Sequence, residues 1–417
     1  MRFKPRRFAA VAFGLALAGT LAASAWAANN AGQLDPSFGG SGYVTTPIGD
    51  FAAAQGVTNY DGGRTVAVGL ADNGTNQDFS LARYNKDGSL DTSFGTGGIV
   101  TTDFGGDEQA TSVAVQGDKV VVAGFTSSDG YVTAQFALAR YNKNGSLDTS
   151  FGSGGKVVTD FGDHQDFADA VAVKGDKIVA AGFANGDFGL AQYTKSGTLD
   201  GSFGSGGLVK TDFDGGFDSA NGVAFRGDTI VAAGYANYHS GNTNFALAAY
   251  DKRGMLDTSF GNGGKVETDF ANGDDAGHAI DVHGDKIVVV GEASIAGNND
   301  FAAAVYDKRG MLDPKFNGTG KATVDIGGYD AAYGGAFGPD DSVVAAGTTF
   351  GVDERFAVAR WTKAGAPDPK FGGGAGFTTT LIGGYSDGLA MTLGPEDKIV
   401  VAGISDGEFA VARYLSK

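Results

Sequence analysis

Acidic and polar side chains recur at two fixed positions ahead of a short "VAV"-like run that occurs seven times in the sequence. Five places before the run, the residue is acidic in five of the seven copies: Ala52, Glu108, Asp166, Asp218, Asp275, Asp330 and Ser386. Two places before it, the residues are mostly polar and all different: Gln55, Thr111, Asp169, Asn221, His278, Tyr333 and Leu389. Carboxylates gathered in this way can hold a cation, accept hydrogen bonds from a sugar, or act as general acid and base.

The third to fifth copies are the richest in such groups. They contain Asp163, His164, Asp166 and Asp169, then Asp214 and Asp218, then Asp274, Asp275 and His278. The candidate ligand-binding residues are therefore Asp166, Asp169, Asp218, Asn221, Asp275, His278 and Asp330. A structural interpretation stays open beside this one, because Asp side chains also accept hydrogen bonds from backbone N–H groups in turns.

Recognised catalytic motifs do not accompany these residues. The chain has four His and no Cys, and it contains no G-x-S-x-G, H-E-x-x-H, Walker or dinucleotide-binding motif. No catalytic residue is assigned and no cofactor is expected, while the metal is unassigned and calcium is left open. The sequence thus favours a binding protein over an enzyme.

The elements that must position these residues are short strands in a long repeat. The motif Phe marks each copy at Phe38, Phe94, Phe151, Phe203, Phe260, Phe316 and Phe371. The markers are 52 to 57 residues apart, and the seven copies fill residues 34–417. Each copy contains four runs rich in Val, Thr, Phe and Tyr between Gly, Asp and Asn, and this pattern predicts four strands per copy.

Seven copies of four strands predict an all-β protein, a β-propeller with seven four-stranded blades. The chain begins with a "GYVTT" strand at 42–46 and ends on the "FAVARY" run, so we expect the N-terminal strand to complete the last blade and close the ring. Residues 28–417 are then a single domain. The loop after "VVVAG" varies from 5 to 11 residues between copies, which places a binding site on the face that carries it.

The motif set "LDxSFGxGGxVxTDF", "VAVxGDKIVVAG" and "FALARY" closely resembles the delta-60 repeat family of exported bacterial proteins, and the resemblance covers essentially all of residues 28–417. The resemblance implies a propeller and carries over no catalytic residue. The last two copies depart from it at Pro314, Pro367, Pro369 and Leu381. The repeated "GSLDTSFG" at 88–95 and 145–152 is interpreted as the fixed joint between blades, with its Asp capping a turn and its Phe packed between sheets.

Residues 1–27 read as a secretory signal peptide, with four basic residues, an apolar run from Phe8 to Ala23 and an Ala25-Trp26-Ala27 cleavage site. We therefore expect a secreted or periplasmic protein. Without this segment the chain has 27 Lys and Arg against 48 Asp and Glu, a net charge of −21. Such a surface repels nucleic acid and anionic lipid, and no later run is long enough to span a membrane.

The leading hypothesis is an exported, monomeric, non-enzymatic propeller that binds a partner protein or an extracellular glycan through its variable face. The alternative is a hydrolase or lyase that acts on polysaccharides or esters with acids at the mouth of the channel. A raised carboxyl pKa in a deep pocket, together with turnover, would favour the alternative.

Overall fold

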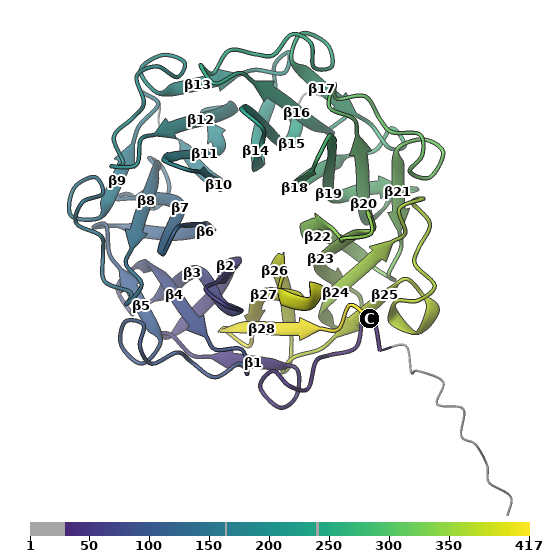
Figure 1. Cartoon of the computed structure of the whole chain (residues 1–417), viewed down its shortest axis with the longest axis horizontal. Coiled ribbons are helices and arrows are strands. Elements are labelled where there is room, and N and C mark those ends of the chain that lie inside the picture. The colour runs from purple at the N-terminus through teal and green to yellow at the C-terminus, as the bar shows by residue number, and fades with distance from the viewer. Residues whose placement is uncertain (1–29, 163–164, 239–241) are drawn as a thin grey trace, which may run out of the picture.

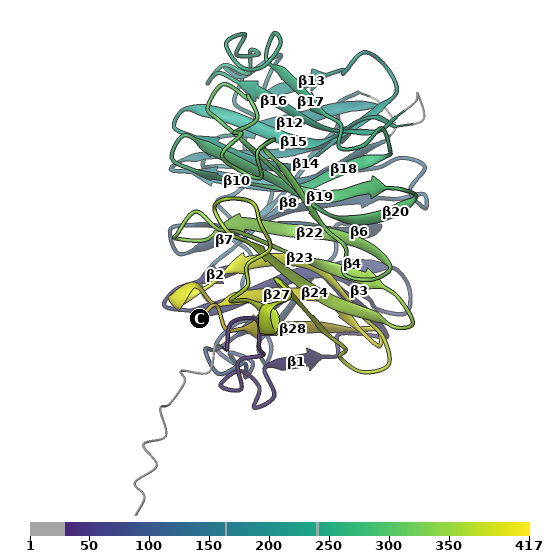
Figure 2. The same cartoon turned by 90° about the vertical axis from the view of Figure 1, so that its right-hand side faces the viewer.

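The computed structural model describes residues 30–162, 165–238 and 242–417, which form seven four-stranded antiparallel sheets arranged in a ring. The chain is thus a seven-bladed β-propeller, as the repeat predicts. Figure 1 looks down the central channel, with the first strand of each blade innermost and the last at the rim. Figure 2 shows the ring from the side as a disc. The predicted signal peptide, residues 1–27, lies outside the described residues.

The strands are numbered along the chain. The first three blades contain β2 (Phe51–Tyr60), β3 (Arg64–Asp72), β4 (Gln77–Tyr84), β5 (Ile99–Thr102); β6 (Asp107–Gln116), β7 (Lys119–Ser127), β8 (Gln135–Tyr141), β9 (Lys156–Thr159); and β10 (Asp166–Lys174), β11 (Lys177–Ala184), β12 (Asp187–Tyr193), β13 (Leu208–Thr211). Blades four and five contain β14 (Phe217–Arg226), β15 (Thr229–Tyr238), β16 (Asn244–Tyr250), β17 (Lys265–Thr268); and β18 (Asp275–His283), β19 (Lys286–Ile295), β20 (Asn298–Tyr306), β21 (Lys321–Val324). Blades six and seven contain β22 (Tyr329–Phe337), β23 (Val343–Phe350), β24 (Glu354–Trp361), β25 (Phe377–Thr380); and β26 (Ser386–Leu393), β27 (Ile399–Ser405), β28 (Glu408–Tyr414), β1 (Tyr43–Thr46). Two single-turn 3₁₀ helices, η1 (Gly372–Gly374) and η2 (Pro395–Asp397), complete the described elements. None of the helices in this part of the chain is long and apolar enough to cross a membrane.

The N-terminal strand closes the ring, as predicted. β1 pairs antiparallel with the C-terminal strand β28, from Tyr43 opposite Ala412 to Thr46 opposite Phe409. The first strand of the chain therefore supplies the outer edge of the last blade. This pairing hides the outer edge of β28, which would otherwise present unpaired backbone groups.

The hydrophobic core is divided among the seven interfaces between blades. In each interface one motif Phe packs against residues from both neighbouring sheets; Phe94, for example, lies with Phe79 of blade one and Val120 of blade two. All seven motif Phe side chains are buried, at 0 to 2% exposure. Burying a side chain of this size contributes about 2–3 kcal/mol. The prediction that this Phe fills the space between sheets is confirmed.

A second repeated contact joins the blades deep in each interface. The Tyr that ends the third strand of one blade shares a hydrogen bond with a Thr of the preceding blade's outer strand in six interfaces: Tyr84–Thr46, Tyr141–Thr102, Tyr193–Thr159, Tyr250–Thr211, Tyr306–Thr268 and Tyr414–Thr380, at 2.8 to 3.0 Å. In the seventh, Trp361 and Val324 take the two places and pack against each other in one cluster. Where Trp361 replaces the Tyr, an apolar Val also replaces the Thr.

The "LDxSF" joint is a capped turn, also as predicted. In every copy the Asp Oδ1 accepts a hydrogen bond from the N–H two residues later, at 2.9 to 3.2 Å, which is the geometry of an Asx-turn. This turn lies at the end of the disc opposite the loops between second and third strands. We call its end the joint face and the other end the variable face.

Candidate functional site

A cavity of about 550 Å³ occupies the central channel. It is lined by the inner strands of all seven blades, and its wall includes all seven residues that stand two places before the "VAV" run: Gln55, Thr111, Asp169, Asn221, His278, Tyr333 and Leu389. Three of the candidate residues, Asp169, Asn221 and His278, are thereby brought together. Asp169 is the only carboxyl among the described residues that line the cavity.

A β-bulge aims each of these side chains at the channel. In every blade the pairing of the first and second strands skips the channel residue; in blade three, Ala168 pairs with Gly182 and Ala170 with Ala181, which leaves Asp169 without an opposite residue. The same shift interrupts the other six inner strands. An extra residue of this kind bends the strand locally and re-aims its side chain.

The glycine that ends each "VVVAG" run is required by this bulge. A Cβ added at Gly182 would stand 1.9 Å from the carbonyl oxygen of Phe167 in the neighbouring strand. The equivalent glycines in the other six blades meet a backbone oxygen at 1.8 to 1.9 Å. No side chain fits at such a distance, so the repeated glycine is explained by the close approach of backbone at the bulge.

Polar side chains around the channel form hydrogen bonds between neighbouring blades. Gln55 Nε2 donates to Gln109 Oε1 at 3.3 Å, Thr111 Oγ1 to the Ala168 carbonyl at 2.7 Å, and Ser219 Oγ to Asp169 Oδ2 at 3.2 Å. Asn221 Nδ2 donates to the Gly277 carbonyl at 2.9 Å. The inner strands of blades one to five are thus joined, each to the next, by a side-chain hydrogen bond. Leu389 in blade seven makes the ring apolar at that point.

His278 of blade five contacts polar residues of blades four, five and six. Its Nδ1 lies 3.3 Å from Asn221 Nδ2, its Nε2 lies 3.7 Å from Glu292 Oε1, and its ring centroid lies 5.0 Å from that of Tyr333. Burial acts to raise the pKa of the Glu292 carboxyl, but His278, followed by Tyr329 and Asn299, outweighs burial, so the pKa is lowered. Burial, followed by the charge of Glu292, raises the pKa of Tyr333 to about 12.

Asp169, the one carboxyl among the described residues of the cavity wall, has a raised pKa. Burial in the channel raises its pKa to about 7, against the opposing effect of the Ser219 hydrogen bond. The carboxyl therefore changes its charge near neutral pH. A group of this kind can donate a hydrogen bond to a ligand or release a proton to it.

The acids five places before "VAV" do not lie at the channel mouth, and that part of the prediction is wrong. Their side chains are 0 to 1% exposed and point into the interface between blades. There they accept hydrogen bonds from the chain that follows the preceding outer strand: Asp166 from Phe161 at 2.9 Å, Asp218 from Phe213 at 2.7 Å, Asp275 from Phe270 at 2.6 Å and Asp330 from Ile326 at 2.7 Å. The backbone N–H groups between each outer strand and the next inner strand need a hydrogen-bond acceptor, and each carboxyl therefore lies beside them rather than in the channel. Asp163 and His164 lie outside the described residues.

An aromatic path on the variable face leads into the cavity, and the sequence analysis did not identify it. Successive ring centroids lie 5.8 Å apart from Tyr131 to Phe125, 4.8 Å to Phe167, 6.2 Å to Phe183 and 6.1 Å to Phe217. Phe125 lines the cavity, while Phe217 is 46% exposed. The signal was present, since Phe125, Phe183 and Tyr235 directly follow the bulge glycine in the second to fourth copies.

Five segments match the model of a family described as a domain of unknown function (DUF5122), β-propeller: residues 63–94, 116–151, 176–203, 228–260 and 285–316. Each segment ends on the motif Phe of its copy. The chain carries repeats of a β-propeller family. The five segments end on the second to sixth motif Phe, and the last segment, 285–316, includes Pro314. The resemblance to the delta-60 family stays a prediction.

Several solved structures are similar to the chain at low sequence identity. Sqt1 from Chaetomium thermophilum, bound to the N-terminus of ribosomal protein L10, has a TM-score of 0.47 and 13% identity, covering 89% of this chain and 98% of that one. The β-propeller domain of the Trilobed protease from Pyrococcus furiosus has a TM-score of 0.43 and 11% identity, with 89% and 95% covered. The GH43 endo-arabinanase from Bacillus licheniformis has a TM-score of 0.35 and 15% identity, with 63% and 96% covered. These values carry no conclusion about function. A comparison with the curated proteins found no match.

Proposed function

We propose that the chain is an exported, non-enzymatic binding module that takes part of a glycan or of a partner protein into the variable-face mouth of its channel. The observation that carries this proposal is the wall of the cavity. The seven blades share one fold and one bulge, yet each contributes a different side chain. Because the fold is the same in every blade while these side chains differ, the fold does not require a particular residue there, and the side chains are available to recognise a ligand.

The available groups indicate the chemistry of the ligand. Gln55 Oε1 is buried and accepts no hydrogen bond from the described residues, and the same holds for Asp387 Oδ1, which stands where blade two has Gln109. Both are acceptors, so they favour a ligand rich in N–H or O–H donors. The aromatic path from Phe217 to Phe125 adds flat apolar surface that reaches the cavity wall at Phe125. A sugar residue or a donor-bearing peptide segment fits this combination.

A hydrolase or lyase is the second candidate, and Asp169 is the observation that favours it. A carboxyl with a pKa of about 7 can act as a general acid at neutral pH. Glycoside hydrolysis in its usual form needs a second carboxyl about 5–10 Å away on the other side of the bond. The described cavity wall offers Asp169 alone, which is why binding without turnover is preferred.

Binding to glycan and peptide arrays, followed by calorimetry on any hit, tests the proposal. We expect Asn221→Ala and Asp169→Asn to weaken the affinity at least about tenfold, as the loss of buried hydrogen bonds does. Asp176→Asn on the joint face, 75% exposed and paired with Lys195, is the matched control and should bind like the wild type. Affinity unchanged in both channel variants would remove the site. Release of product that disappears in Asp169→Asn would replace binding by catalysis.

Export is proposed from residues 1–27 alone. Expression of the full chain in a bacterium, followed by cell fractionation and mass determination of the N-terminus, provides the test. We expect the exported protein to begin at Ala28. A cytoplasmic protein that keeps residue 1 would contradict the proposal.

A further inference from the structure

Three acidic trios recur at equivalent places on the variable face. Each trio consists of the residue before the Phe of the "FALARY" run in the third strand, the Asp that follows the outer strand, and the acid at the start of the next blade's inner strand. They are Asp78, Asp103 and Glu108 between blades one and two, Asp187, Asp212 and Asp218 between three and four, and Asp300, Asp325 and Asp330 between five and six. In each trio one carboxylate oxygen per residue lies within 4.8 Å of the others.

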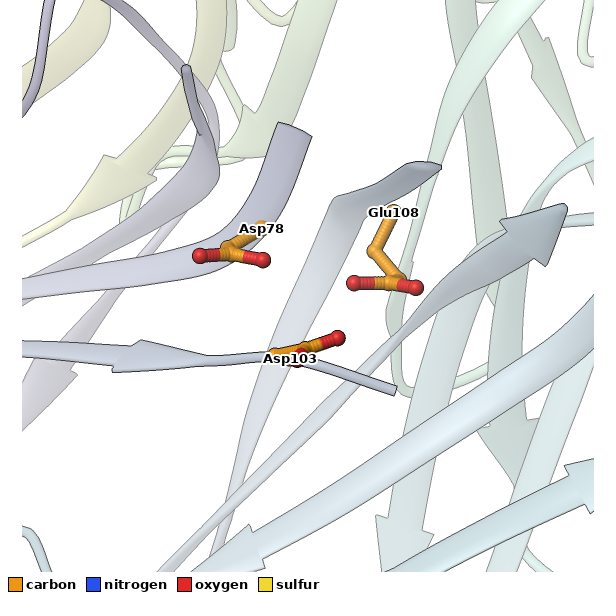
Figure 3. A group of neighbouring side chains, drawn as sticks. All are labelled: Asp78, Asp103 and Glu108. Atoms are coloured by element: carbon orange, nitrogen blue, oxygen red, sulfur yellow. The ribbon is translucent and has the colours of Figure 1, made fainter. Parts of the chain in front are cut away.

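In the first trio two of the three carboxyls are buried. Asp78 is 8% exposed and Glu108 is 0% exposed, while Asp103 lies open to solvent. Figure 3 shows the carboxyl groups of Asp78 and Glu108 turned toward each other, with that of Asp103 beside the gap between them. The trio is thus a pocket of carboxylate oxygens with one side open to water.

Two oxygens of this pocket accept no hydrogen bond from the described residues. Asp78 Oδ2 accepts from Asn73 at 2.9 Å, and Glu108 Oε1 accepts from the Gly106 N–H at 2.7 Å and from Thr126 at 3.0 Å. Asp78 Oδ1 and Glu108 Oε2 are buried and have no such donor. Because a buried carboxylate oxygen without a donor is costly, these two atoms point to a missing positive partner.

No basic side chain among the described residues forms an ion pair with the first or third trio. The second trio differs, since Lys210 Nζ lies 3.6 Å from Asp187 Oδ2. Elsewhere the chain does supply cations to buried acids, as Arg83 does for Asp91 at 2.9 Å. Lys156 Nζ lies beside the first trio but donates to the Asp103 backbone carbonyl oxygen, at 2.9 Å, rather than to a carboxyl. Burial raises the pKa of both Asp78 and Glu108.

The other interfaces show that three acids are not required by the fold. Between blades two and three, Gln135 stands in the place of Asp78, beside Asp160 and Asp166. Between four and five, Asn244 takes that place. Between six and seven all three acids are gone, and Arg355, Leu381 and Ser386 replace them. The third carboxyl therefore occurs in addition to the structural contacts of the interface.

We propose that the first and third trios, and more weakly the second, are binding sites for a hard divalent cation of the calcium class. Calcium takes oxygen ligands at about 2.3–2.6 Å, so two of its ligands can be at most about 5 Å apart, in agreement with the trios. Water entering beside Asp103 or Asp325 completes the coordination. The cation joins two blades at each site and stabilises the ring. This role is independent of any ligand in the channel.

Thermal unfolding and calorimetry with calcium chloride alone as the probe test the sites. After treatment with a chelator, the full chain should melt a few degrees higher when millimolar calcium is restored, since a ligand bound by the folded state alone stabilises it. Calorimetry should give two or three sites per chain. The double variant Asp78→Asn, Asp300→Asn should melt above the wild type in chelator, because repulsion is relieved, and should lose most of the calcium-dependent rise.

The chain also offers a gain-of-site variant. Gln135→Asp restores the trio between blades two and three, and we expect one additional calcium per chain. Asp176→Asn on the joint face should leave the calcium response unchanged. An unchanged wild-type melting temperature with calcium, together with a higher one in the double variant, would show that protons neutralise the trios and would overturn the proposal. A calcium-dependent rise as large in the double variant as in the wild type would also overturn it.

Discussion

Arg413 Nε donates a hydrogen bond to Asp35 Oδ2 at 2.8 Å and so joins the last strand of the chain to the segment that precedes its first strand. The guanidinium also lies over the Phe38 ring, 4.7 Å from its centroid, and donates to Ser37 Oγ at 2.9 Å. Asp35 is 3% exposed. The same arrangement recurs as Arg83–Asp91, Arg140–Asp148 and Arg360–Asp368. In blade seven, where β1 pairs with β28, it joins the two ends of the chain and so holds the ring closed.

Replacing Arg413 by Ala should therefore cost about 3 kcal/mol of unfolding free energy, because it leaves a buried carboxylate with Lys398 as its remaining cation. Urea unfolding of the full chain measures the change. Arg309→Ala is the control, since its pair with Asp307 is 70% and 38% exposed and should contribute less than about 0.5 kcal/mol. Equal effects of the two substitutions would show that the junction is not held by this pair.

The same pair sets an acid limit to stability. Burial raises the pKa of Asp35, but hydrogen bonds from Ser37 and Lys398 and the charge of Arg413 outweigh burial and hold it well below its ordinary value of 3.8. A depressed folded pKa gives a contribution that is present above the ordinary pKa and is lost as the pH falls below it. In Asp35→Asn, unfolding free energy should fall less steeply below pH 4 than in the wild type.

The acidic partner of these arginines could not be predicted from the sequence. In the sequence, the Arg of the "FALARY" run and the Asp of the following "TDF" run do not vary together from copy to copy. The structure explains why: the Arg forms its ion pair with the Asp eight residues later, at the joint. That Asp does not vary with the Arg either, because it also caps the turn in all seven copies. Blades and ring closure follow from the repeat, since strand patterns and glycines are local. Contacts between blades depend on bulges and turns that alternation of side chains does not reveal.

The bulge glycine gives a sharp test of how the channel residues are positioned. Gly182→Ala should destabilise the protein by about 3 kcal/mol or more, since its Cβ would meet the Phe167 carbonyl oxygen at 1.9 Å and the backbone would have to move. Gly201→Thr is the control. Nothing lies within 4 Å of a Cβ at Gly201, and Thr92, Thr149 and Thr258 occupy its place in other copies, so stability should hold or rise slightly. If Gly182→Ala were as stable as the wild type, the bulge geometry would be wrong.

A double-mutant cycle tests the Tyr–Thr contacts between blades. Tyr250→Phe and Thr211→Val should each cost about 1–2 kcal/mol, because each leaves the other buried hydroxyl without its partner at 2.8 Å. The double variant should cost much less than the sum, because it leaves no buried hydroxyl without a partner. Urea unfolding of the four proteins gives the coupling energy. Additive losses would indicate that the two hydroxyls do not interact.

Asp169 predicts a change in stability near neutral pH that its own substitution isolates. Because burial raises its folded pKa to about 7, its neutral form stabilises the fold at low pH, and this contribution is lost as the pH rises from about 4 through 7. Asp169→Asn has no charge to bury, so we expect its unfolding free energy relative to the wild type to rise by about 3 kcal/mol between pH 4.5 and pH 8. Urea unfolding in chelator keeps the acidic trios out of the comparison. Asp176→Asn, exposed on the joint face, should follow the wild-type curve at both pH values. A constant difference between Asp169→Asn and the wild type would mean that the carboxyl is ionised throughout, and it would then serve a channel ligand as an acceptor of hydrogen bonds only.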